Sequence, residues 1–235
     1  RDWSSDVCSS DLNNHDFTGW QRWSDYKGVY QQWSEFIEFK NLVIMGGEPL
    51  LNATINEWIT GLSDIFKCGV QILSNGTRLS QTKGLYDAII EGGRLSGYMP
   101  HMGISLHNIY QFDEIRENIL DFLDTIKEEH YKNYYPGVYY SARDCNNVLV
   151  NVYLSNNFYP AAVIPQVNGR FTLYNSDPVV AHNGCGFAKY KCYHFIRGKI
   201  YKCGPAALLP EFDEQHNLDI SEEDRKIIKI GRAHV

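Results

Sequence analysis

Short apolar runs alternate with amphipathic segments along most of this chain, and this alternation limits the folds it can adopt. The runs typical of buried strands cover residues 42–45, 70–73, 102–106 and 148–154, with the start of a fifth at 161–165. Between them, apolar residues recur every three or four positions, which indicates helices over 54–66, 79–91 and about 109–129, after an aromatic-rich helix within 13–40. The pattern predicts an α/β fold made of parallel βαβ units.

The composition argues against several classes of partner. The net charge is −6, and this mild acidity gives no reason to expect nucleic acid or an anionic membrane as a partner. No apolar run approaches the ~18 residues that a membrane span needs. The late clustering of Cys185, Cys192 and Cys203 fits reduced thiols or a metal site better than a disulfide framework, and it predicts a cytoplasmic protein.

Both ends of the chain are expected to be foreign to the natural protein. Residues 6–12 and 230–235 can be encoded by DNA strings that are reverse complements of each other and match a common sequencing adapter. The same adapter, read further upstream, also encodes residues 1–5. We therefore assign residues 1–12 and 230–235 to adapter sequence and leave them out of the fold argument. The natural segment is then expected to be 13–229, cut at both ends.

The segment Met45-Gly-Gly-Glu-Pro49 directly follows the first predicted strand and indicates a ligand site. In parallel α/β sheets, ligands bind beyond the carboxyl ends of the strands. Gly46 and Gly47 can take positive φ and let a ligand approach the backbone, and Pro49 favours an extended conformation at Glu48. Such a segment suits a ligand ammonium group. A tight turn with a solvated glutamate explains these residue types equally well.

GGEPLL after an apolar strand resembles the glycine-glycine-glutamate-proline motif of the radical S-adenosylmethionine enzymes, where it binds the amino group of the cofactor's methionine part. Two later segments, VQILSNGT (70–77) and GISLH (103–107), resemble the next strand ends of that family in the same order. The resemblance covers about residues 13–165 and implies a partial (β/α)6 barrel that lacks its first strand. It implies cofactor contacts from Gly46, Gly47, Glu48, Pro49, Ser74, Asn75, Ser105 and His107. A histidine at a strand end, such as His107, is more often a hydrogen-bonded structural residue.

One element of the family is missing. Its three-cysteine loop, which holds a [4Fe-4S] cluster, lies upstream of GGEP, but residues 13–40 contain no cysteine. We expect the intact gene to encode this loop, and the polypeptide as given not to cleave S-adenosylmethionine.

For the intact protein the resemblance implies oxidoreductase chemistry: reductive cleavage of S-adenosylmethionine to a 5′-deoxyadenosyl radical that removes a hydrogen atom from a substrate. It also implies a reductant such as flavodoxin or ferredoxin. A peptide or protein substrate is preferred, with small molecules left open. No side chain stands out as a general acid, base or nucleophile.

A second group of chemistry-bearing residues lies near the end of the chain. FIRGKIYKC (195–203) predicts a hairpin turned at Arg197-Gly198 that returns Cys203 to the side of Cys192. Together with Cys185, these thiolates can hold an iron–sulfur cluster or zinc. The spacing of Cys185, Gly198 and Cys203 resembles the start of the SPASM and twitch extensions of radical enzymes. It implies an auxiliary [4Fe-4S] cluster in an extension over residues 166–229.

Other interpretations of these residues stay open. His182 and His194 are alternative ligands, and the cysteines of the extension are also compatible with unrelated buried thiols. Cys68 and Cys145 are predicted to be packing residues. Two other functions fit the sequence: a non-catalytic module that binds zinc or an iron–sulfur cluster, and a scaffold that binds S-adenosylmethionine without cleaving it.

Overall fold

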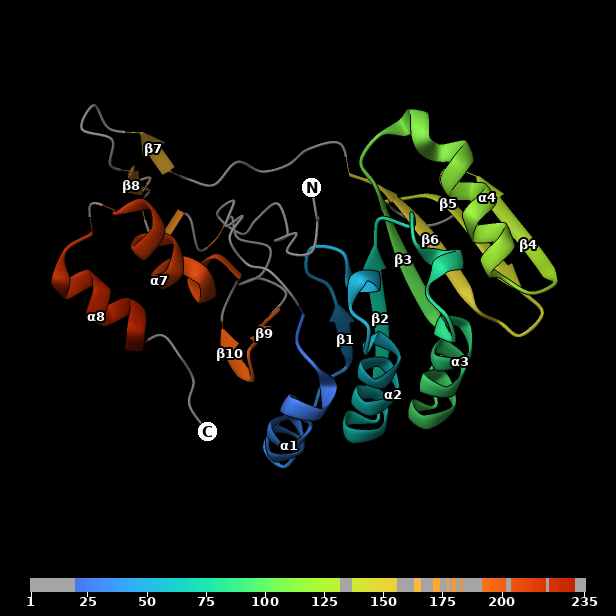
Figure 1. Ribbon diagram of the computed structural model, residues 1–235, viewed down its shortest axis with the longest axis horizontal. Helices are drawn as coiled ribbons and strands as arrows, with labels where there is room; N and C mark the ends of the chain where they lie inside the picture. The colour runs from blue at the N-terminus through green and yellow to red at the C-terminus, as the bar shows by residue number, and fades with distance from the viewer. Residues whose placement is uncertain are drawn as a thin grey trace. The chain divides into compact units, whose positions relative to one another are not determined.

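The computed structural model describes residues 20–131, 137–155, 163–165, 171–173, 177, 179–180, 183, 192–201, 204–218 and 220–230. The described residues up to 155 belong to one compact unit, and those from 163 onward belong to a second (Figure 1). The two units are described separately below.

A six-stranded sheet forms the centre of the first unit, which confirms an α/β fold. The strand order is β1-β2-β3-β6-β5-β4. The bounds in that order are Asn41–Ile44, Gly69–Ser74, His101–Leu106, Leu149–Leu154, Val138–Asp144 and Ile126–Tyr131. The strands β1, β2, β3 and β6 are parallel, whereas β5 and β4 are antiparallel to their neighbours. The first four predicted strands are therefore confirmed, and they form the parallel part of the sheet.

The helices α2 (Ile55–Phe66), α3 (Leu85–Ser96) and α4 (Phe112–Phe122) lie between successive strands of this sheet. Because the parallel strands follow one another in a single direction, right-handed crossovers place their helices on the same face. Both α2 and α3 pack against β2 and against each other, and Figure 1 shows the two helices side by side. On α4, the Phe112 ring centroid lies 5.4 Å from that of Tyr140 on β5.

The two faces of the sheet differ in chemistry. The helix-covered face carries apolar side chains that are at most 1% exposed: Ile72, Met102, Ile104, Val150 and Val152. These residues are paired in register, as Ile72 with Met102 and Ile104 with Val152, so their side chains share one face. The intervening positions form what we call the polar face: Gln71, Leu73, His101, Gly103, Ser105, Leu149, Asn151 and Tyr153. The hydrophobic core of the first unit therefore lies between the sheet and its helices.

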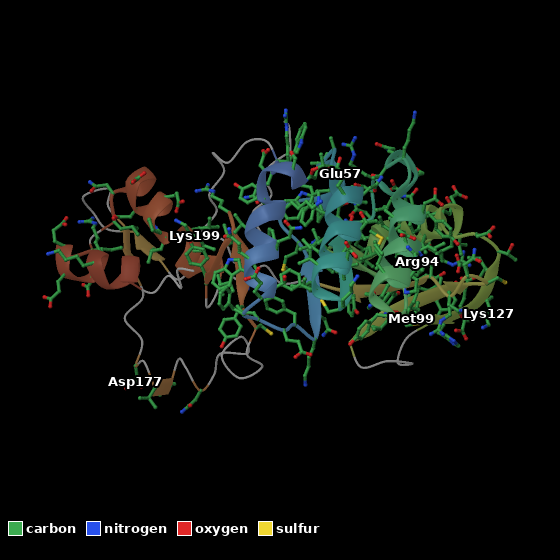
Figure 2. All side chains as sticks on the ribbon, turned by 90° about the horizontal axis from the view of Figure 1, so that it is seen from below. Glu57, Arg94, Met99, Lys127, Asp177 and Lys199 are labelled. Atoms are coloured by element: carbon green, nitrogen blue, oxygen red, sulfur yellow. The ribbon has the colours of Figure 1, made fainter. Side chains whose placement is uncertain are left out.

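The first helix, α1 (Trp23–Ser34), confirms the helix expected within 13–40. Its aromatic side chains pack on α2, where the Trp23 and Trp58 ring centroids are 5.0 Å apart. A Cβ atom on Gly61 of α2 would lie 2.2 Å from the Trp23 ring, so a larger residue there would push α1 away. Exposed charged side chains cover the outside of the unit, among them Glu57 on α2 and Arg94 on α3 (Figure 2).

The helix predicted over 109–129 is wrong in its second half. The structure has a 3-10 turn, η3 (Ile109–Gln111), then α4, which ends at Phe122. Residues 126–131 form β4, and β5 follows as a strand that the sequence analysis missed. Leu123 and Ile126 continue the helical spacing of apolar residues, which is why periodicity extended the helix too far.

The helix predicted over 79–91 also has other bounds. A 3-10 turn, η2 (Leu79–Gln81), precedes α3, which runs through the two glycines at 92–93 and ends at Gly97 with φ 75°. Gly92 serves packing instead of ending the helix, since a Cβ atom there would lie 3.1 Å from Ile59 Cγ2 on α2. The proposed capping box at Thr54 is absent, because Thr54 Oγ1 bonds to Asn52 Oδ1 at 2.9 Å.

The second unit contains two hairpins and two helices in its described part. The strand expected from 161 is β7 (Val163–Pro165), but it pairs antiparallel with β8 (Phe171–Leu173) and does not join the six-stranded sheet. The predicted hairpin is confirmed: β9 (His194–Ile196) and β10 (Lys199–Tyr201) flank Arg197 and Gly198, which have φ of 51° and 73°. Two consecutive positive φ values are typical of a type I′ turn. The helix α7 (Gly204–His216) packs on this hairpin, and α8 (Glu222–Ile230) follows.

Replacing Lys67 by glycine is expected to stabilise the protein by about 1 kcal/mol. Lys67 ends α2 in the left-handed conformation, with φ 49° and ψ 37°, which disfavours any residue with a Cβ atom. Its ion pair with Asp64 is exposed and contributes little. Urea unfolding measures the change. The Lys67→Ala variant is the control, because it loses the ion pair but keeps the strain; a glycine variant no more stable than the alanine variant would contradict the prediction.

Candidate functional site

The carboxyl ends of β1 and β2 bring together three of the residues predicted to bind a ligand. Glu48 Oε1 accepts hydrogen bonds from Ser74 Oγ at 2.7 Å and from the Leu50 backbone N–H at 3.0 Å. Its Oε2 accepts the backbone N–H of Asn75 at 2.8 Å. Glu48 is only 7% exposed. The interpretation of Glu48 as a solvated side chain is therefore wrong, and its carboxylate joins two neighbouring strand ends.

The backbone before Glu48 has the conformation that its sequence predicts, except at one glycine. Glu48 is extended, with φ −127° and ψ 104°, and Pro49 begins the 3-10 helix η1 (Pro49–Leu51). Gly46 has φ 149°, whereas Gly47 is not in the positive-φ region. A Cβ atom at Gly46 would meet no other atom within 4 Å. The space beside this backbone segment is therefore accessible to a ligand.

Ser74 and Asn75 also hold their own turn. Ser74 Oγ accepts the Gly76 N–H at 3.0 Å, and Asn75 Oδ1 accepts the Thr77 N–H and Oγ1–H at 2.9 and 2.7 Å. Asn75 therefore reaches Glu48 through its backbone, while its side chain closes the turn that follows β2.

Ser105 and His107 lie on β3 and just after its end, respectively. Ser74 is in register with Ile104, so Ser105 projects from the opposite face of the sheet to Ser74. Within the described residues, no hydrogen bond joins Ser105 to Glu48. His107 Nδ1 lies 3.1 Å from the carbonyl oxygen of Ser155, and the Ser155 N–H donates to Leu106 O. His107 thus links the ends of β3 and β6, in agreement with a structural role.

The electrostatics of the strand ends favour a cationic ligand. A buried carboxylate needs charged or hydrogen-bonding partners, and Glu48 has hydrogen bonds from two backbone N–H groups and one hydroxyl. No ion pair with Glu48 is formed by the part of the chain that the structure describes. A carboxylate has about four lone-pair positions, so this group can accept one more donor. A primary ammonium group supplies such a donor together with the missing positive charge.

The predicted metal ligands are only partly covered by the structure. Cys185, Cys203 and His182 lie outside the described residues. Cys192 is exposed and precedes β9, in which burial lowers the pKa of His194. Among the described residues, no group of three His, Cys, Asp or Glu side chains is placed to hold a metal.

The predictions for the two remaining cysteines have different outcomes. Cys68 is a packing residue, as predicted: it is buried, and burial raises its thiol pKa to about 11. Cys145 is exposed, so its prediction is wrong; it follows β5 in the turn to β6, where its backbone N–H donates to Thr125 O.

The sequence analysis missed a buried polar network at the opposite end of the sheet. Asp144 is fully buried and accepts hydrogen bonds from the Tyr86 hydroxyl at 2.5 Å and from the N–H groups of Asn146 and Val148 at 2.9 Å. Desolvation and the bond to Asp144 raise the pKa of Tyr86 to about 12. The segment Asp144-Cys-Asn-Asn147 carries a turn signal that could have located this turn, but not its buried partner Tyr86.

The sequence analysis also missed most of the polar face. On β3, His101, Gly103 and Ser105 alternate with apolar residues, and this period of two was the available signal. Asn151 on β6 is 6% exposed, and its Nδ2 lies 3.0 Å from His101 Nε2. Its Oδ1 has no hydrogen-bond partner.

Comparisons of this chain with models of protein families, with curated proteins and with solved structures find no match. In the described part of the chain, none of the helices has the length and apolar character needed to cross a membrane.

Proposed function

We propose that this chain is the part of a radical S-adenosylmethionine enzyme that binds the methionine end of the cofactor. The observation that carries the proposal is the buried carboxylate of Glu48, which joins the carboxyl ends of two parallel strands and can accept one more donor. It follows the open backbone at Gly46. A GGEP segment in this position is what the resemblance to the family implies.

The order of the strands supports a partial barrel as the fold behind this function. The parallel strands run in a single direction, as in a (β/α) barrel, and not outward in two directions as in a doubly wound sheet. In a barrel, the face opposite the helices is the interior, which here is the polar face. The antiparallel strand β5 occupies the position beside β6. A further parallel strand therefore cannot pair with β6, and the proposed barrel is open at this edge.

The residues present fit the methionine part of S-adenosylmethionine. Glu48 would accept a hydrogen bond from the amino group and balance its charge, and Ser74 and Asn75 would hold the carboxylate in place. The backbone at Gly46 would lie against the ligand, since no side chain fills that space. The cofactor, once reductively cleaved, supplies the radical that removes a hydrogen atom from a substrate.

The residues present do not fit the cluster that such cleavage requires. No cysteine occurs between Cys8 and Cys68, so this polypeptide has no three-cysteine loop before the GGEP segment. We therefore derive no electron-transfer step for it. After anaerobic reconstitution with iron and sulfide, this chain is expected to form no 5′-deoxyadenosine from S-adenosylmethionine.

Binding of S-adenosylmethionine, measured by isothermal titration calorimetry, tests the proposal. Glu48→Gln keeps the size of the side chain and removes its charge. It is expected to weaken binding about tenfold to a hundredfold, because hydrogen bonds to charged groups contribute about 1.5–3 kcal/mol.

Two controls make the test specific. Glu57→Gln changes an exposed glutamate on α2 (Figure 2) and should leave the affinity unchanged. Binding of 5′-methylthioadenosine, which lacks the amino acid part, should not respond to Glu48→Gln. Failure of the folded parent chain to bind S-adenosylmethionine would refute the proposal, as would equal affinity in the Glu48→Gln variant.

A further inference from the structure

The polar face of the sheet is unusual for parallel strands. Strands of a parallel sheet that is packed on both sides read as nearly continuous apolar runs. On β2, β3 and β6, however, hydrogen-bonding side chains alternate with core residues; these are Gln71, His101, Ser105, Asn151 and Tyr153. All of them are half-buried or buried. This face is therefore built for polar contacts and not for a second hydrophobic core.

The centre of this face holds an unsatisfied carboxamide. Asn151 donates through Nδ2 to His101 Nε2 at 3.0 Å, while Oδ1 is buried and has no partner. Leaving such an acceptor unpaired costs about 1–3 kcal/mol. A buried group with this cost requires an explanation, and a bound donor is the simplest one.

A gap in the side-chain layer lies beside Asn151. Gly103 is paired with Asn151 in register and has no side chain. The space above it is filled by flexible side-chain ends: a Cβ atom there would lie 2.7 Å from Gln71 Nε2, 3.0 Å from Leu73 Cδ1 and 3.1 Å from Tyr153 Cε2. Rotation of the Gln71 and Tyr153 side chains would open this space to a ligand without moving the backbone.

The charge of this region indicates which ligand fits. The positions of β2, β3 and β6 that make up the polar face carry no Asp, Glu, Lys or Arg. Burial lowers the pKa of His101, so its imidazole is neutral at neutral pH. The charges on the same face of the β4–β5 hairpin are paired, with Arg143 Nε 3.0 Å and His130 Nε2 3.3 Å from Glu128 oxygens. An anionic ligand would find no unpaired cation in these strands.

We propose that the polar face binds the backbone of a peptide, with Asn151 Oδ1 accepting a peptide N–H above Gly103. A peptide group is uncharged and offers both a donor and an acceptor, which matches the amide and hydroxyl groups of this face. The inference deepens the proposed function by naming a peptide as the substrate class, and it rests on that function only for the word substrate. Binding itself is independent of S-adenosylmethionine.

The test uses the full chain and an uncharged probe, acetyl-triglycine amide, in an NMR titration of asparagine-labelled protein. Saturable shifts of the Asn151 side-chain signals are expected at millimolar probe. Asn151→Leu, which is similar in size and apolar, is expected to weaken binding about tenfold, the factor that corresponds to one lost hydrogen bond of about 1.4 kcal/mol. It should not lower the melting temperature, because it removes an unsatisfied polar group.

Further arms separate the alternatives. Gly103→Ala fills the gap and should also weaken probe binding, which tests the site even if Asn151→Leu fails to fold. Inorganic phosphate and acetate should bind at least about tenfold more weakly than the probe. No saturable binding, or unchanged binding in the variants, would overturn the proposal and leave Asn151 Oδ1 as a site for buried water. Glu48→Gln should not affect the probe, so failure of one proposal is distinguishable from failure of the other.

Discussion

The Asp144→Ala variant is expected to lose about 3–5 kcal/mol of unfolding free energy, the largest effect of any single change considered for this protein. Asp144 is fully buried, and its carboxylate accepts hydrogen bonds from Tyr86, Asn146, Val148 and, at 3.3 Å, the backbone N–H of Asp124. Alanine would leave these donors without their acceptor. Because the donors belong to α3, the turn before β4 and the turn before β6, three connections would loosen together.

Urea unfolding followed by tryptophan fluorescence measures this loss, since Trp23 and Trp58 are buried in the same unit. The Asp144→Asn variant keeps one acceptor oxygen and should lose less than the alanine variant. Asp121→Ala, at an exposed position of α4, is the matched control and should stay within about 0.5 kcal/mol of the parent. A similar stability for the Asp144→Ala and Asp121→Ala variants would show that the network does not hold these turns.

The second large effect is expected at Glu48, where alanine should cost about 2–4 kcal/mol. The carboxylate is the acceptor for Leu50 N–H, Ser74 Oγ–H and Asn75 N–H, and it connects the end of β1 to the end of β2. Ser74→Ala removes one donor and should cost only about 1 kcal/mol. Measured together, the two variants separate the role of the carboxylate from that of its hydroxyl partner.

This measurement also distinguishes a structural glutamate from one that additionally binds a ligand. Saturating S-adenosylmethionine should stabilise the parent chain, because a ligand that binds only the folded state raises the unfolding free energy. It should stabilise the Glu48→Gln variant less. If Glu48→Ala unfolds at the same urea concentration as the parent, the hydrogen bonds assigned to Glu48 do not form in solution.

Local sequence patterns identified the elements whose neighbours are set by the chain itself. The apolar runs at 42–45, 70–73, 102–106 and 148–154 became strands, and the hairpin at Arg197-Gly198 formed where its turn residues indicated. The meeting of Glu48 with Ser74 and Asn75 was also predictable, because the carboxyl ends of neighbouring parallel strands meet at one edge of the sheet.

Patterns failed where contacts between distant residues compete with local preference. Residues 126–131 fit a helix by apolar spacing, yet they form β4. There, Glu129 is bonded to Arg116 of α4 at 2.7 Å and to the Tyr140 hydroxyl of β5 at 2.8 Å. The turn before β4 is fixed by Asp144, twenty residues later in the chain. No local signal reports on these partners.

The sequence by itself determined the βαβ succession and the place of Glu48 at a strand end, because both follow from periodicity and from backbone preferences within a few residues. Only the tertiary structure decided that β4 and β5 form an antiparallel edge, that Ser105 projects from the opposite face to Ser74, and that Asn151 is buried with an unpaired oxygen. These features depend on pairing register and on burial, which are set by groups far apart in the chain.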